Sequence, residues 1–302
     1  MVEQTKESFG RLGAQRRAQR RAGLWYDAYQ RLSKNKLALA CTGLVLGLLL
    51  MSIFADVIAP YPYDEAHFAD GWLFPFQDAR YPLGTDSLGR DMLSRLIYGG
   101  RVSLAVGIGA ELLGLIIGLP LGLLAGLRGG RTDYVIGRAV DVFSSLPYMV
   151  VVILMIALLG PGLFNIFLAI GISSWVQSCR LIRGQVLSVK RSLPVRAAIS
   201  MGAGQWHIMR SHLIPNAIPP VIVAVTLGIP EKIFAEAGLS FLGLGVRPPI
   251  PSWGLMVGES FQFARGYYHL VLFPALLVAF TMLGFTLMGD GLRDALDPRM
   301  SD

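Results

Sequence analysis

Six long apolar runs divide this chain of 302 residues, and each is about as long as a helix that crosses a lipid bilayer. They lie at 37–59, 102–127, 134–159, 165–181, 216–239 and 270–288. A backbone in lipid must satisfy its hydrogen bonds internally, so such runs fold as helices. Charged residues make up 16% of the chain, against about 25% in soluble domains. The sequence predicts an all-α integral membrane protein with six transmembrane helices.

Basic residues predict the orientation of these helices. They gather in the segment 1–36, with Arg16, Arg17, Arg20 and Arg21 close together, in the turn 128–138 and in the loop 180–210. Because Lys and Arg are retained on the cytoplasmic side, we expect cytoplasmic tails at 1–36 and 290–302. The first apolar run is too long for a signal peptide and has no evident cleavage site. The net charge of +7 reflects this orientation and a contact with lipid, so no nucleic-acid partner is expected.

The acidic stretch 60–101 is then an external loop. Its second half, YPLGTDSLGRDMLSRLIYGG, has turn residues followed by the apolar positions Met92, Leu93, Leu96 and Ile97. This spacing predicts a helix that lies on the outer membrane surface. The stretch 241–269, rich in turn residues, is a second external loop.

The remaining five spans form a core over 102–289, and small residues mark one face of its first helix. Ala110, Gly114, Gly118, Gly122 and Gly126 recur every fourth residue. Such a row allows a neighbouring helix backbone to approach closely. In the next run, Pro147 predicts a kink.

Ionisable residues within the spans are costly in lipid and must face protein or water. They are Glu111, Asp141, Glu231, Lys232 and Glu236. Lys232 and Glu236 are one helical turn apart, so they could form a structural pair. The other interpretation is that these groups line a solute pathway.

The segment 190–215 is a polar, basic interruption between two spans. Pro194 suits the first turn of a short helix, and Gly202 and Gly204 would end that helix before a second one. No Asp or Glu occurs from Lys190 to Asn216. We therefore expect a compact cytoplasmic knob that another protein grips.

Motifs for catalysis and nucleotide binding are absent from the sequence. It contains no GxxxxGK[ST], HExxH, paired CxxC or GxSxG, and its four histidines lack metal-ligand spacing. Cys41 and Cys179 lie in or at the end of apolar runs, so a disulfide framework is not expected. We expect a chain that is no enzyme and binds no cofactor or metal, whose energy source lies in another subunit.

The 190–215 segment resembles the EAA signature of ATP-binding-cassette (ABC) importer permeases: E-A-A, three residues, G, nine residues, I, one residue, L-P. Ala197, Ala198, Gly202 and Pro215 match; Arg196 replaces Glu, His212 replaces Ile, and Ile214 replaces Leu. The LGTDSLGRD stretch is similar to LGTD-x-x-GRD in C-type permeases of peptide importers, and AEAGLSFLGLG, PSWG and GDGLRDALDP extend the likeness.

This resemblance implies the C-type permease subunit of a peptide ABC importer with the type I fold, similar above all to oligopeptide permeases. It implies a B-type permease partner, two ATPase subunits that bind ATP and Mg, an external peptide-binding protein and a bacterial plasma membrane. The ATPase contact would fall on Arg196, Ala197, Ala198, Gly202, Ile214 and Pro215. A rival interpretation is an ion-coupled secondary transporter or channel that uses the intramembrane carboxylates; an intramembrane enzyme would need a nucleophile and base that are missing.

Overall fold

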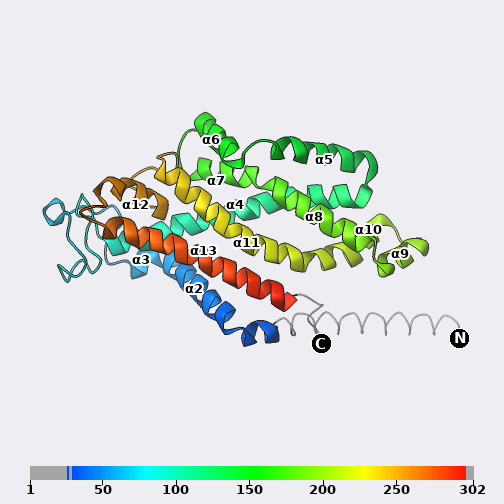
Figure 1. Ribbon diagram of the computed structural model, residues 1–302, viewed down its shortest axis with the longest axis horizontal. Helices are drawn as coiled ribbons and strands as arrows, with labels where there is room; N and C mark the ends of the chain where they lie inside the picture. The colour runs from blue at the N-terminus through cyan, green and yellow to red at the C-terminus, as the bar shows by residue number, and fades with distance from the viewer. Residues whose placement is uncertain (1–25, 27–28, 297–302) are drawn as a thin grey trace.

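The computed structural model describes residue 26 and residues 29–296, and these residues form helices and loops without a strand. Figure 1 shows the longer helices running along the long axis of the molecule. Five helical stretches are long and apolar enough to cross a bilayer: Lys36–Ile53, Met92–Arg128, Leu163–Lys190, Gln205–Phe241 and His269–Leu296. A bent pair, Gly130–Ser144 and Tyr148–Leu159, gives a sixth span if the pair is counted as one. The predicted all-α membrane fold is confirmed.

The first span is α2 (Lys36–Ile53), which begins where the side chain of Asn35 accepts a hydrogen bond from a first-turn N–H at 3.1 Å. Its C-cap is Phe54, and the one-turn helix α3 (Ala55–Ile58) follows. The predicted run 37–59 therefore contains two helices. The guanidinium of Arg101 donates hydrogen bonds to two carbonyls at the end of α2. These carbonyls therefore keep hydrogen-bond partners where the helix breaks.

The second span is one continuous helix, α4 (Met92–Arg128), whose N-cap is the carboxylate of Asp91. We expected a separate surface helix before residue 101, and this expectation is wrong. The helix continues without a break through Gly99 and Gly100. A Cβ atom on Gly100 would lie 2.9 Å from the ring of Trp253. The glycine therefore provides room for a neighbour inside an unbroken helix.

The loop 59–91 joins α3 to α4 and is fixed by its own side chains. It contains one 3-10 turn, η1 (Phe68–Asp70). The carboxylate of Asp86 accepts a hydrogen bond from Arg90 Nε at 2.6 Å. The ring of Trp72 lies 4.5 Å from the ring of Tyr267, which attaches this loop to the segment that precedes the last span.

The third predicted span is sharply bent. Helix α5 (Gly130–Ser144) follows a turn at Gly129, where φ is 67°, and α6 (Tyr148–Leu159) begins after Pro147. The two helices are bent by 84° relative to each other. Proline has no N–H and restricts the residue before it, so the expected kink at Pro147 is a complete break.

The next helices connect the middle of the bundle to one of its ends. α7 (Leu163–Ser173) and α8 (Trp175–Lys190) form the fourth span. The short helices α9 (Leu193–Ser200) and α10 (Gln205–Ile208), with the π-helix η2 (Met209–Leu213), lie at that end in Figure 1. The long helix α11 (Ile214–Phe241) then returns through the bundle.

The opposite end holds a helix that the sequence did not predict, α12 (Trp253–Ser260), and the turn η3 (Phe261–Phe263). The last span, α13 (His269–Leu296), runs past the expected boundary at 288. Most of the expected N-terminal tail, including Arg16, Arg17, Arg20 and Arg21, lies outside the described residues, as do residues 297–302.

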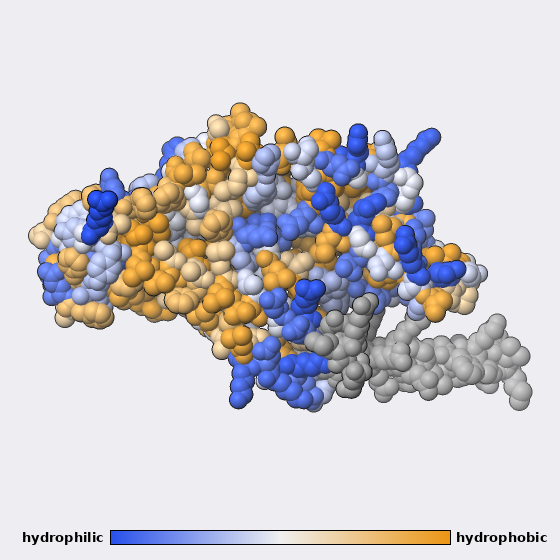
Figure 2. Space-filling view, viewed as in Figure 1, coloured by the Kyte–Doolittle hydropathy of each residue, from blue (hydrophilic) through white to orange (hydrophobic). Residues whose placement is uncertain are grey.

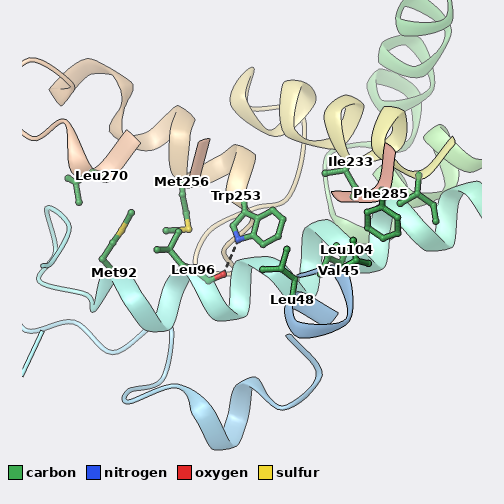
Figure 3. Packing of buried hydrophobic residues seen from close by; sticks show 11 residues of the cluster. Val45, Leu48, Met92, Leu96, Leu104, Ile233, Trp253, Met256, Leu270 and Phe285 are labelled. Atoms are coloured by element: carbon green, nitrogen blue, oxygen red, sulfur yellow. Dashed lines mark hydrogen bonds between the residues drawn. The ribbon is translucent and has the colours of Figure 1, made fainter. Parts of the chain in front are cut away.

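Apolar side chains from α2, α4, α11, α12 and α13 meet in one core. Figure 3 shows the indole of Trp253 among Leu96, Met256 and Leu48, with its Nε1 donating to the Leu96 carbonyl at 2.9 Å. Leu96 had been expected on a surface helix. Its burial fixes α12 against the first turns of α4.

The outer surface of the bundle is also apolar. Large hydrophobic side chains such as Leu46, Leu50, Leu154 and Leu158 are exposed on α2 and α6. Figure 2 shows apolar side chains gathered over the middle of the molecule and more hydrophilic ones toward the end that carries α9 and α10. A soluble protein rarely exposes so much contiguous apolar surface, whereas lipid covers it.

Candidate functional site

The 190–215 segment folds as a knob at one end of the bundle. Pro194 lies in the first turn of α9, and the chain turns at Gly202, where φ is 80°. Residues with a Cβ rarely adopt this conformation, so glycine sets the angle between α9 and α10. The predicted pair of short helices is present, and η2 continues directly into α11.

The inner side of the knob is packed against the two spans that it joins. Val195, Ile208 and Leu213 are buried and form a cluster with residues of α8 and α11, such as Ile182 and Val221. This packing makes the knob a continuation of those helices. The knob is therefore packed against both spans that it joins.

The outer side of the knob is exposed and contains three of the six predicted contact positions. Arg196, Ala197 and Gly202 are exposed, whereas Ala198 is buried inside the knob. Ile214 and Pro215, at the start of α11, are half-buried.

Sequence reasoning missed three large apolar side chains on this surface. Leu193, Met201 and Trp206 are 80%, 81% and 70% exposed. Figure 2 shows apolar side chains among polar ones at this end. Their presence in the otherwise polar, basic 190–215 segment could have indicated this apolar surface.

The row of small residues on α4 lies against α7 and α8. Cβ atoms on Gly114, Gly118, Gly122 and Gly126 would lie 2.6–2.7 Å from side-chain or backbone atoms of residues 174–186. Ala110 packs in a separate apolar cluster with residues of α6 and α7. The two backbones are therefore too close for any side chain at these glycines.

Three of the predicted ionisable residues meet near the middle of the molecule. Lys232 Nζ on α11 lies 3.8 Å from Glu111 Oε2 on α4 and 3.5 Å from Glu231 Oε2. The ammonium also lies 5.4 Å from the centre of the Tyr148 ring, within reach of a cation–π interaction. Glu111 and Lys232 are buried, so each depends on the other charge.

Glu236 does not pair with Lys232, which corrects the pair suggested by their spacing. The fully buried Glu236 carboxylate accepts hydrogen bonds from Ser103 at 2.8 Å and Ser240 at 2.7 Å. Lys232 pairs with Glu111 and Glu231 instead, so Lys232 and Glu236 have different partners. Asp141 is exposed and lies 4.0 Å from Arg180.

Two adjacent cavities surround the charged group. The larger, about 940 Å³, lies between α6, α8 and α11 and is lined by Arg180, Glu231 and Lys232 together with apolar side chains. The smaller, about 230 Å³, is lined by Glu111, Gln177 and Glu231, among others. Glu231 therefore borders both spaces.

Comparison with known proteins places this arrangement in a family. The family model described as "Binding-protein-dependent transport system inner membrane component" matches residues 118–302. A second, "N-terminal TM domain of oligopeptide transport permease C", matches residues 23–78.

Similar proteins cover nearly the whole chain. The "Dipeptide transport system permease protein DppC" of Bacillus subtilis is 42% identical over 91% of this chain and 85% of its own length. The "Oligopeptide transport system permease protein OppC" of the same organism is 39% identical over 95% of this chain and 93% of its own length. OppC of Escherichia coli is 38% identical over 91% of both chains.

The fold is also found in a solved ABC transporter. A chain of the MetNI methionine ABC transporter, described as inward facing, superposes with a TM-score of 0.55 at 21% identity over 68% of this chain and 98% of that chain. The expected type I importer permease fold is confirmed. The chain belongs to the binding-protein-dependent transport system inner membrane components, as a multi-pass permease of the oligopeptide and dipeptide permease C type.

Proposed function

We propose that this chain is the permease subunit of an ATP-driven peptide importer and that its 190–215 knob couples it to separate ATPase subunits. The observation that carries this proposal is the two-sided knob. Its inner side is packed on α8 and α11, and its outer side exposes Leu193, Met201 and Trp206. Clustered exposed apolar side chains are typical of a protein contact.

The distribution of charge supports the proposed orientation in the membrane. The knob is basic and lacks acidic residues from Lys190 to Asn216, which favours the cytoplasmic side. Both termini would then be cytoplasmic, in a bacterial plasma (inner) membrane. The opposite end, with α12 and the loop 59–91, would face the peptide-binding protein.

The proposed assembly has this chain as a non-catalytic part. A B-type permease would complete the pathway, and two ATPase subunits would bind ATP and Mg. Their closure would move the knob as a rigid body and, through α8 and α11, change which side of the membrane the pathway opens to. Oligopeptides are the expected substrates.

Gly202→Pro is expected to lower ATP-driven uptake of an oligopeptide at least about tenfold while ATP hydrolysis continues. The φ of Gly202 is 80° and its N–H donates to the Ile199 carbonyl at 2.9 Å. Proline fixes φ near about −65° and has no N–H, so the turn between α9 and α10 must change. Uptake and hydrolysis are measured in proteoliposomes that contain both permeases, the ATPases and the binding protein.

Gly204→Pro is the matched control. Its φ of −67° and ψ of 154° suit proline, and a Cβ there would meet no atom within 4 Å. Uptake near that of the unchanged complex is expected. Full uptake by the Gly202→Pro complex would contradict the role of the knob, and absence of ATP-driven uptake by the unchanged complex would contradict the proposed function itself.

A further inference from the structure

The wall of the larger cavity carries Arg180, Glu231 and Lys232 among apolar side chains. Figure 2 shows hydrophilic side chains over α8 and α11 in the middle of the apolar region. Glu231, which borders both cavities, has a side chain that is 61% exposed. An ionised group exposed to lipid is costly, so this wall must face water or protein.

The charges around the cavities leave one carboxylate in excess. The ammonium of Lys232 is shared by Glu111 and Glu231, at 3.8 and 3.5 Å. Arg180 lies 4.0 Å from Asp141 and donates a hydrogen bond to the Ser144 hydroxyl. One lysine therefore faces two carboxylates.

The carboxylates of Glu111 and Glu231 differ in how accessible they are to a solute. Glu111 is held in the interface between α4 and α11, where a Cβ on Gly228 would lie 2.5 Å from its carboxyl carbon. Its side chain is 9% exposed, and that of Lys232 is 5% exposed. Glu111 thus neutralises Lys232 inside the protein, and Glu231 carries the excess charge at the cavity wall.

We propose that the Glu231 carboxylate is a binding site for the ammonium group at the amino terminus of a transported peptide. The ammonium supplies the positive charge that the Glu111–Lys232–Glu231 group lacks. The apolar side chains of α6 and α8 that line the same cavity, such as Met155 and Val176, would contact the remainder of the solute. This inference rests on the proposed function and assigns a peptide-contacting residue within it.

The test changes the charge at one position in the assembled complex. A Glu231→Cys chain is incorporated with its partner permease, ATPases and binding protein, and uptake of trialanine with a free amino terminus is measured. Loss of the carboxylate is expected to lower uptake at least about tenfold, the factor that corresponds to about 1.4 kcal/mol.

The thiol is then modified with methanethiosulfonates of different charge. A negatively charged ethylsulfonate adduct is expected to restore uptake several-fold, whereas a neutral or a trimethylammonium adduct is not. Cys41 and Cys179 are buried, and the unmodified chain treated with the same reagents controls for other thiols. Asp290→Cys, an exposed position on α13 that lines neither cavity, is the matched control variant and should transport normally.

Each other outcome would overturn the inference. A thiol at position 231 that does not react in the assembled complex would show that the solute cannot reach this wall. Equal rescue by neutral and negative adducts would show that volume matters and charge does not. Unchanged uptake by Glu231→Cys, with normal ATP-driven transport, would reject this site alone, whereas no uptake by the unchanged complex would reject the proposed function.

Discussion

Gly118→Leu is expected to reduce recovery of the assembled complex to less than about a tenth, because overpacking at a helix interface costs at least about 1–3 kcal/mol. A Cβ alone at this position would lie 2.6 Å from the Trp175 carbonyl oxygen and 2.8 Å from the Cys179 backbone nitrogen. Backbone atoms cannot rotate away as a side-chain tip can. The leucine would force α4 and α8 apart, and Gly118→Ala should show a smaller loss.

Gly43→Leu is the control for adding a leucine to a membrane helix. Gly43 lies on α2, is exposed, and has no atom within 4 Å of a Cβ built there. Membrane insertion and complex recovery are measured by tagged purification from equal amounts of membrane. Normal recovery of Gly118→Leu would contradict the close α4–α8 packing.

The double substitution Met201→Asp and Trp206→Asp is expected to remove the ATPase subunits from the purified complex while leaving the permease inserted. Both side chains are exposed on the knob, and neither belongs to its buried apolar cluster. Two carboxylates would replace the apolar contact, and buried unpaired charges at an interface are strongly unfavourable. ATPase recovery should fall at least about tenfold, which corresponds to about 1.4 kcal/mol.

Phe76→Asp is the matched control for the new charge. Its side chain is highly exposed in the loop 59–91, at the opposite end of the bundle. The control should retain the ATPase subunits in a pull-down through a tag on the permease. Retention of the ATPases by the double variant would mean that the contact lies elsewhere on the chain.

Sequence periodicity predicted local features well because it depends on residues within one helix. The fourfold spacing of Gly114, Gly118, Gly122 and Gly126 indicated a close approach, and the structure places α8 there. The identity of the neighbour could not be derived, since it depends on how distant spans pack.

Features that depend on distant residues were the ones missed. A surface helix was expected to be separate from the second span, but the two are one helix, in which Gly100 accommodates Trp253, more than 150 positions later in the chain. The helix α12 has a serine N-cap at Ser252. The sequence did not predict this helix because turn residues flank it. Its position is fixed by burial of Trp253 against α4.

The charged residues show the same limit. Spacing suggested that Lys232 pairs with Glu236, because the two are adjacent on one helix face. The structure instead pairs Lys232 with Glu111 of another span, and hydroxyl groups satisfy Glu236. Pairing across spans cannot be predicted from the pattern of a single helix.

Affinity purification of the tagged chain from its native membrane, followed by identification of the proteins recovered with it, tests the central claim most directly. The proposed assembly predicts a second permease and two ATPase subunits, either two kinds or two copies of one kind. Recovery of the chain alone, together with solute transport by the purified chain in liposomes without ATP, would contradict the account and favour an ion-coupled transporter or channel.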